Sequence, residues 1–193
     1  MKILGIAGGT ASGKTTVARA LVERLGPTAA LLSHDRYYRD VPEPAGFNYD
    51  HPDALDTALL VQNLDELRRH GRTELPVYTF ASHRRQARTE TLVAPELLVV
   101  EGILVLAGPQ LVERFDLRVY VHAPDDIRLA RRVRRDAVER GRTAESVLDQ
   151  YLATVRPMHE RFVAPSRALA DLVLDGTTAA DGLVDQLLEL IGG

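Results

Sequence analysis

The chain has 193 residues, 45% of them hydrophobic and 26% charged, which suits one α/β domain with a full hydrophobic core. Its formal net charge of −3 at pH 7 provides no general basic field for binding nucleic acid or a membrane surface. The absence of cysteine excludes disulfides and thiolate zinc sites, and the first apolar run is too short for a signal peptide or a membrane span. We therefore expect a cytoplasmic protein.

The first predicted element is a short buried strand over residues 3–7, which leads into a sequence that fits G-x-x-x-x-G-K-[ST]. In such a loop, glycines allow a tight turn and backbone N–H groups surround the phosphates of a nucleoside triphosphate. Lys14 is expected to reach the β- and γ-phosphates, and the Thr15 hydroxyl to bind Mg²⁺. The predicted ATP-binding residues are Gly8, Gly9, Thr10, Ala11, Ser12, Gly13, Lys14, Thr15 and Thr16.

The alternative is a glycine-rich turn with an incidental lysine. The composition argues against it, because Lys14 is one of only two lysines among 24 basic residues. Phosphate oxygens favour a compact ammonium group, and the chain provides one where it otherwise uses arginine. After the loop, Val17, Leu21 and Leu25 share one face of a predicted helix that ends at residues 26–27.

A second strand is predicted over residues 29–33 and is followed closely by Asp35. In an open parallel sheet, ligands bind beyond the carboxyl ends of the strands, so Asp35 is expected in the crevice facing the phosphate loop. There it can accept a hydroxyl proton or bind Mg²⁺. The alternative for Asp35 is a helix-capping or turn role.

Aromatic residues gather after this strand in a chain that is only 5% aromatic. They flank a Pro- and Gly-containing loop, residues 41–46, and include Tyr37, Tyr38, Phe47 and Tyr49. Two interpretations stay open: an additional part of the core, or the wall of a nucleobase pocket.

A helix capped by Asp56 and ended by Gly71 is predicted next, with leucines at 59, 60, 64 and 67. Residues 76–80 and 91–93 then alternate like strands around the polar segment 82–88. This pattern predicts a hairpin insertion, about residues 76–95, that stands off the main sheet.

Residues 97–100 are an uninterrupted apolar run, typical of a central buried strand, and Glu101 follows directly. A buried strand-end carboxylate without a partner is costly. We therefore expect Glu101, with Asp35, to provide the two carboxylates of a magnesium site.

A short helix after residue 109, containing Leu111, Val112 and Phe115, and a strand over 117–121 come next. A helix then begins at residues 124–126. Seven arginines follow, at 128, 131, 132, 134, 135, 140 and 142. Such a run can be a solvated helix face or a nucleic-acid patch.

The apolar positions within this arginine run, and the break at Gly141, instead favour a mobile lid, about residues 136–146, that brings arginines onto phosphates. A helix over residues 147–158, a strand over 170–174 and a helix over 183–191 complete the predicted elements.

Taken together, the chain resembles the uridine–cytidine kinase family of P-loop kinases, a branch related to phosphoribulokinase. The matching segments extend from about residue 3 to 175: Gly8–Thr16, Asp35–Tyr38, Asn48–Asp53, Tyr78–His83, Glu101–Leu106, Arg131–Arg142 and Gln150–His159. The resemblance implies one P-loop NTPase domain over residues 1–193, a three-layer α/β fold with a mostly parallel central sheet. It also implies a β-hairpin at the substrate site and an arginine-rich helical lid.

The activity implied is transfer of the ATP γ-phosphoryl group to the 5′-hydroxyl of uridine or cytidine, with Mg²⁺ as cofactor. Asp35 is then the base, while Thr15 and Glu101, with Asp35 nearby, hold the metal. Asp50 and Arg132 bind the ribose hydroxyls. Tyr78 and His83 contact the edge of the pyrimidine, and Tyr38 and Phe80 flank its ring. Gln150 helps to close the nucleoside site. Lys14, Arg135, Arg140 and Arg142 serve the transferred phosphoryl group.

The resemblance also implies a homo-oligomer, a tetramer. The chain departs from the family pattern at Thr79, where an Asp is usual, at His122 and at Asp175-Gly176. Rival interpretations are a related kinase for another small alcohol, such as phosphoribulose or pantothenate, and a nucleotide-dependent regulator. Neither gives a purpose to both Asp35 and the cluster of tyrosines with His83.

Overall fold

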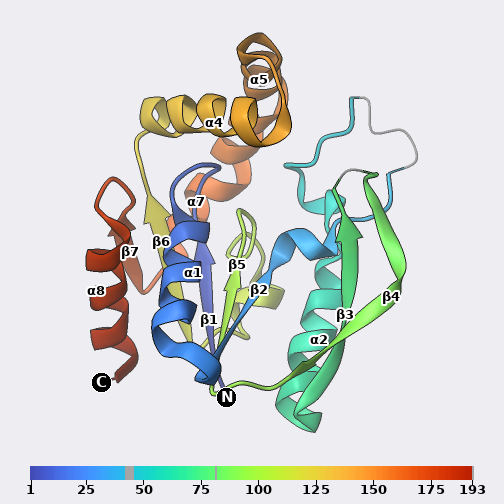
Figure 1. Cartoon of the computed structure of the whole chain (residues 1–193), viewed down its shortest axis with the longest axis vertical. Helices are drawn as coiled ribbons and strands as arrows, with labels where there is room; N and C mark the ends of the chain where they lie inside the picture. The colour runs from blue at the N-terminus through green and yellow to red at the C-terminus, as the bar shows by residue number, and fades with distance from the viewer. Residues whose placement is uncertain (42–45, 81, 193) are drawn as a thin grey trace.

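A five-stranded parallel sheet forms the centre of the molecule in the computed structural model, which describes residues 1–41, 46–80 and 82–192 (Figure 1). The strand order is β2-β5-β1-β6-β7. These strands are β1 (Lys2–Ala7), β2 (Ala29–Ser33), β5 (Leu97–Glu101), β6 (Leu117–His122) and β7 (Leu172–Asp175). Because every pairing is parallel, all carboxyl ends meet at one edge, where ligands of such sheets bind.

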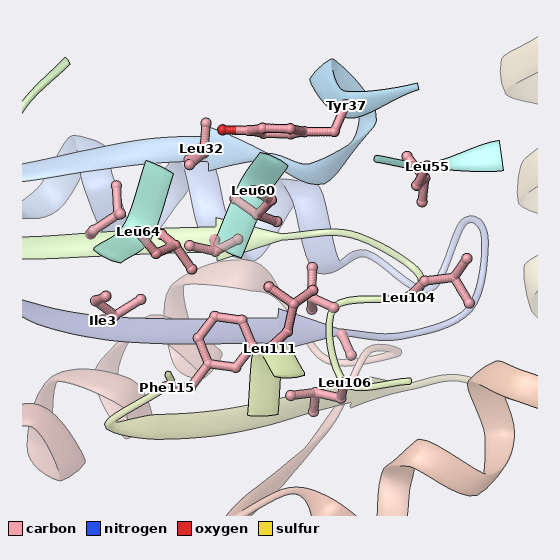
Figure 2. Close-up of a cluster of buried hydrophobic side chains, with 14 of the residues drawn as sticks. Ile3, Leu32, Tyr37, Leu55, Leu60, Leu64, Leu104, Leu106, Leu111 and Phe115 are labelled. Atoms are coloured by element: carbon pink, nitrogen blue, oxygen red, sulfur yellow. The ribbon is translucent and has the colours of Figure 1, made fainter. Parts of the chain in front are cut away.

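Helices cover both faces of the sheet and make the three layers that the sequence predicts. On one face, α1 (Lys14–Leu25) and α8 (Ala180–Gly192) pack on β1 through Leu4 and Ile6. On the other face, α2 (Thr57–His70) and α3 (Pro109–Val112) cover Ile3 (Figure 2). Successive residues of a strand point to opposite faces, so β1 is apolar on both sides.

Most predicted elements are present with small shifts at their ends. Asp56 caps α2 by accepting from the backbone N–H of Leu59 at 3.3 Å, and Gly71 ends it in the left-handed conformation. The helix after residue 109 is shorter than predicted, because α3 ends at Val112 and Phe115 lies beyond it. Phe115 is nevertheless buried in the core.

The two strands of the hairpin are longer than the sequence predicts. Strand β3 (Arg72–Thr79) pairs antiparallel with β4 (Arg84–Val93) in a sheet of their own beside α2 (Figure 1). Interpreting residues 82–88 as a polar connection was therefore wrong for residues 84–88. Almost every residue of β4 is exposed, so the strand lacks the apolar alternation by which sequence reasoning recognises strands.

The arginine run lies on α4 (Asp125–Arg140) and in the connection to α5 (Ala144–Gln150), at the end of the molecule that holds the carboxyl edge of the sheet (Figure 1). The mobile lid at about residues 136–146 of this region stays a prediction. After α5 the chain stays helical to residue 169, including α6 (Arg156–Met158) and α7 (Ala164–Ser166). Two wide π-helical turns, residues 151–155 and 159–163, come just before Pro157 and Pro165. Proline lacks the N–H that a regular helix needs, which explains the irregular turns.

Among the described residues, no helix combines the length and apolar character needed to cross a membrane.

Candidate active site

The loop between β1 and α1 turns sharply at the carboxyl edge of the sheet. Gly8 has a φ of 152°, and a Cβ there would lie 2.4 Å from the carbonyl oxygen of Val121. Gly13 is left-handed, and α1 then begins at Lys14 without a side-chain cap. The first N–H groups of α1 therefore lack helical acceptors, and with the helix dipole they suit a phosphate group. This geometry supports the predicted phosphate-binding role of residues 8–16.

Glu101 is the centre of a small polar group just beyond the phosphate loop. Its carboxylate accepts from the hydroxyls of Thr15 at 2.9 Å and Ser33 at 2.8 Å. The ammonium of Lys14 lies 3.9 Å away. These residues meet because the parallel register sets Ser33 and Ile6 beside Glu101. Ser33 was missed in the sequence, where only its place at the end of a predicted strand signalled it.

Asp35 lies in a single 3₁₀ turn, His34–Tyr37, directly after β2. It is not the capping residue of the turn, because the Ser33 hydroxyl accepts from the Asp35 N–H at 3.3 Å. Burial, and then the negative charge of Glu101, raise the pKa of Asp35 to about 6, while Lys14 and Arg140 oppose the rise. A carboxylate with this pKa is a stronger base than an exposed aspartate and is still ionised at neutral pH.

A cluster of rings lies next to Asp35. Tyr38 contacts Tyr49 with ring centroids 5.6 Å apart and Tyr78 at 5.7 Å. Tyr78 in turn lies 5.2 Å from Phe80, and Tyr49 lies 5.0 Å from the imidazole of His83. We call Tyr38, Tyr49, Tyr78, Phe80 and His83 the ring cluster. It joins three segments that are far apart in the sequence.

The ring cluster is not simply an extension of the core. The hydroxyls of Tyr49 and Tyr78 are buried, and neither has a hydrogen-bond partner among the described residues. Phe80 is 57% exposed, so the cluster opens to solvent at one side. Tyr37, by contrast, is core: it is fully buried and donates to Asn63 at 2.9 Å. Buried hydroxyls without partners favour the nucleobase-pocket interpretation, because such groups are costly unless a ligand satisfies them.

Arg85, on β4, is a residue that the sequence reasoning missed. Its guanidinium donates to the backbone carbonyls of Tyr37 at 2.9 Å and Tyr38 at 3.0 Å, and to the carboxylate of Asp56 at 3.1 Å. It thereby fastens the hairpin to the segment that carries Asp35. Its only signal in the sequence was its place among the polar residues of the hairpin.

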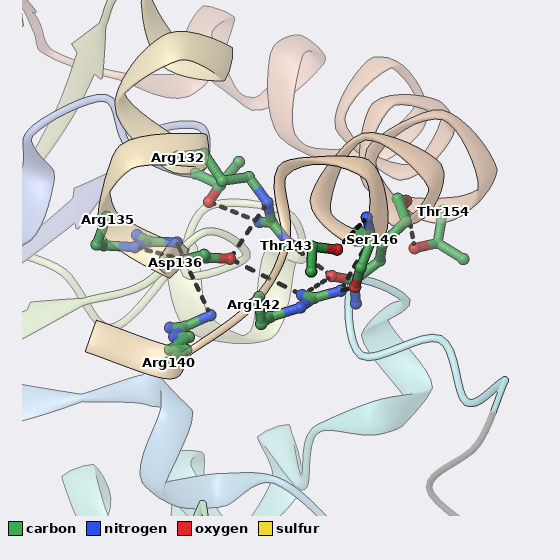
Figure 3. A network of polar contacts seen from close by, with 10 residues as sticks. Arg132, Arg135, Asp136, Arg140, Arg142, Thr143, Ser146 and Thr154 are labelled. Carbon is green, nitrogen blue, oxygen red and sulfur yellow. Dashed lines mark hydrogen bonds and ion pairs between the residues drawn. The ribbon is translucent and has the colours of Figure 1, made fainter. Parts of the chain in front are cut away.

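The lid arginines surround Asp136 (Figure 3). Asp136 is fully buried, and its carboxylate lies within 4.0 Å of four guanidinium groups, those of Arg132, Arg135, Arg140 and Arg142. Arg128 and Arg132 are buried as well. The arginine run is therefore not a solvated helix face along its whole length.

One polar contact connects the arginine run to the phosphate loop, and two more connect it to Gln150 at the end of α5. Arg132 donates to the Thr10 hydroxyl at 2.9 Å and to the Gln150 side-chain oxygen at 2.9 Å, and Arg142 donates to the same oxygen. Arg132 also lies close enough to Asp50 to oppose the rise in the pKa of Asp50 that burial causes. The side chain of Arg142 is 27% exposed and is joined to α5 through the Ser146 hydroxyl.

Oxygen donors at the site suit Mg²⁺. The Thr15 hydroxyl donates to the Glu101 carboxylate, and the negative charge of Glu101 helps to raise the pKa of the nearby Asp35. The described residues contain no group of three or more metal-binding His, Cys, Asp or Glu side chains. Mg²⁺ needs no such cage, since it takes one or two carboxylates and completes its shell with water and phosphate oxygens.

Residues 3–181 match the model of the phosphoribulokinase/uridine kinase family. The chain belongs to this family. It is 48% identical over 180 residues to a uridine kinase of Chloroflexus aurantiacus, covering 90% of this chain and 86% of that one. It is 40% identical over 199 residues to a uridine kinase of Ligilactobacillus salivarius, covering 98% and 93%.

Solved structures agree on the fold of the phosphoribulokinase/uridine kinase family. A phosphoribulokinase from Rhodobacter spheroides matches with a TM-score of 0.67 at 18% identity, covering 92% of this chain and 72% of that one. At that identity the likeness supports the fold alone. Membership in the family makes the protein an ATP-dependent P-loop kinase, and the predicted α/β fold with a mostly parallel sheet is confirmed.

Proposed function

We propose that the protein transfers the γ-phosphoryl group of ATP to the 5′-hydroxyl of uridine or cytidine, giving UMP or CMP. The observation that carries this proposal is the position of Asp35 in the turn between Ser33, which is bonded to Glu101, and Tyr38, which belongs to the ring cluster. An acceptor ring in that cluster brings its sugar hydroxyl toward Asp35. The curated relatives named uridine kinase support the same substrate class.

In this mechanism the phosphate loop and Lys14 bind the triphosphate of ATP. Thr15, Glu101 and Asp35 would hold Mg²⁺, which supplies charge neutralisation when bound. Asp35 accepts the proton of the 5′-hydroxyl as that oxygen attacks the γ-phosphorus, and the bond from the γ-phosphorus to the β,γ-bridging oxygen breaks, so that ADP leaves with that oxygen. Arg135, Arg140 and Arg142 stabilise the charge on the transferred group.

The acceptor is held by its ribose and its base. Asp50 and Arg132 bind the 2′- and 3′-hydroxyls, and Gln150 helps to close the site. Tyr38 and Phe80 flank the ring, while Tyr78 and His83 read its edge. We add Tyr49 to this group, since its ring lies against both Tyr38 and His83.

Two rival functions, a kinase for another small alcohol and a nucleotide-dependent regulator, fit less well. A phosphorylated sugar or pantothenate has no aromatic ring to occupy the ring cluster, and a nucleotide-dependent regulator needs no acceptor pocket.

We also propose a cytoplasmic location, where ATP and nucleosides are available, and a homo-oligomer, a tetramer by family resemblance. An assay of ADP release with nucleosides, with sugar phosphates and without acceptor tests the function. We expect turnover with uridine and cytidine, and turnover with ribulose 5-phosphate alone would contradict the proposal.

The ring cluster leads to a prediction about base selection. Uridine presents a carbonyl at C4 and cytidine an amino group, and neutral imidazole can donate to one or accept from the other. We therefore expect kcat/KM values for uridine and cytidine within about 100-fold, equivalent to roughly 2.7 kcal/mol. Deoxycytidine should lose the contacts of Asp50 and Arg132, and adenosine should not fit. A larger uridine-to-cytidine ratio would show that His83 does not read the base in this way.

A second prediction concerns Arg85. Arg85→Gln removes charged donors from the carbonyls of Tyr37 and Tyr38, interactions worth about 1.5–3 kcal/mol each. Because these bonds join the two walls of the ring cluster, we expect KM for uridine to rise roughly tenfold and kcat to change much less. Arg84→Gln is the matched control, since Arg84 is the exposed neighbour on the same strand. Equal KM values for the two variants would contradict a role for Arg85 in shaping the pocket.

A further inference from the structure

We infer that Asp136 is a positioning residue for phosphoryl transfer, and that it acts by setting the guanidinium groups of the lid. The inference rests on the proposed function. Asp136 is on the last turn but one of α4 and is fully buried. It cannot touch ATP or nucleoside in this arrangement, so any effect on the reaction passes through the side chains around it.

The carboxylate of Asp136 contacts three arginines of its own helix, α4, and one arginine beyond the end of that helix. Arg135 donates to Oδ1 from Nε at 2.9 Å, and its Nη2 lies 2.8 Å away. Arg132 and Arg140, one helical turn before and after, lie 3.8 Å and 3.5 Å from the carboxylate. Positions four residues apart share one face of a helix, so the helix itself directs both side chains toward Asp136.

The fourth arginine comes from beyond the end of the helix. Gly141 is left-handed, with a φ of 62°, and turns the chain back. The backbone N–H of Arg142 then donates to the carbonyl of Asp136 at 3.1 Å, and its guanidinium lies 3.8 Å from the Asp136 carboxylate. Both the backbone and the side chain of Asp136 therefore hold the start of the lid.

The charges around Asp136 do not balance. Among the described residues, Asp136 is the only carboxylate within 4.0 Å of these four arginines, which leaves a local excess of three positive charges. Asp136 Oδ2 and Arg132 Nε also find no hydrogen-bond partner within the described part of the chain. A pair formed only for stability would neutralise its charges and satisfy its donors. An excess of guanidinium donors suits a site that receives an anion.

The arginines held by Asp136 include one that contacts the phosphate loop directly. Arg132 is bonded to Thr10 of the phosphate loop. Misplacement of such groups by about 1 Å can cost as much as 100-fold in rate. Among the described residues, Asp136 is the one carboxylate within 4.0 Å of all four arginines.

Two Asp136 variants test the inference. Asp136→Asn keeps the shape and removes the charge, and Asp136→Glu keeps the charge and moves it by one methylene. For both we expect kcat with ATP and uridine to fall roughly 10- to 100-fold, well beyond any change in KM for ATP. Glu139→Gln, at an exposed position of the same helix, is the control and should match the wild type. If Asp136→Asn does not fold, Asp136→Glu alone tests the inference. A kcat for Asp136→Glu equal to that of the wild type would overturn the inference.

A double-mutant cycle separates positioning from a merely structural role. If Asp136 acts through Arg135, the loss caused by Asp136→Asn should be at least about threefold smaller in an Arg135→Gln background. Equal losses in both backgrounds, or a lower melting temperature with unchanged kcat for the folded protein, would overturn the inference. A wild-type protein without nucleoside-dependent turnover would instead overturn the proposed function together with the inference.

Discussion

Asp35→Asn is expected to lower kcat for uridine phosphorylation by about 10²–10⁴ and to leave ATP binding intact. The amide keeps the shape of the side chain but cannot accept the proton of the 5′-hydroxyl. Asp35 is also the group whose surroundings are tuned most clearly for this task, since burial and Glu101 raise its pKa to about 6. Steady-state kinetics and ATP titration test the prediction, and activity within a few-fold of the wild type would remove Asp35 from the role of base.

The same variant should be more stable than the wild type at neutral pH. Asp35 has a folded-state pKa of about 6 against 3.8 in the unfolded chain, so its ionisation opposes folding. This destabilisation is absent below pH 4, develops between pH 4 and 6, and is complete above. At about 1.4 kcal/mol per pKa unit it amounts to about 1–3 kcal/mol, or roughly 2–4 °C in Tm for each kcal/mol.

Thermal melts of the ligand-free protein at pH 4 and pH 8 check the stability prediction. The Tm gain of Asp35→Asn should be present at pH 8 and vanish at pH 4. Asp53→Asn is the control, because the Asp53 side chain is 92% exposed, and it should show no comparable gain. A stability gain independent of pH would mean that the charge of Asp35 is not its cause.

Arg140→Gln is expected to lower kcat by about 10³ or more, within the range that arginines on a transferred phosphoryl group supply. Its side chain is 53% exposed and contacts Asp136 only at 3.5 Å, so the folded protein depends little on it. We therefore expect an unchanged Tm. A large fall in Tm with normal kcat would show that Arg140 is structural.

Arg142→Gln should behave differently from Arg140→Gln. Arg142 donates to Gln150, to the Ser146 hydroxyl at 3.0 Å and to the Ser146 carbonyl at 3.1 Å. Its replacement should lower both kcat and Tm, because these bonds join the loop after α4 to α5. Comparing the two variants by the same melts and kinetics distinguishes an exposed arginine that contacts Asp136 from one that is also bonded to α5.

Local sequence patterns were enough to predict the sheet and its helices. The apolar runs at residues 3–7 and 97–100, the cap at Asp56 and the glycine at residue 71 are all local signals, and each gave the element that the structure contains. The phosphate loop could be predicted for the same reason, since its glycines and Lys14 must be close in sequence to surround one triphosphate. Strand β4 was not recognised as a whole, because its side chains face solvent and carry no apolar alternation.

Which residues meet across the site was decided only by the tertiary structure. Ser33 reaches Glu101 because a parallel register sets two strand ends side by side, and no local pattern encodes that register. Arg85 reaches the carbonyls of Tyr37 and Tyr38 only once the hairpin packs against them. In the sequence, Asp136 is one more charge in a charged helix, whereas burial among four arginines makes it their common partner. Burial and long-range pairing depend on how the segments pack together, so the sequence alone determined the elements and the phosphate loop, and packing determined the partners of each charge.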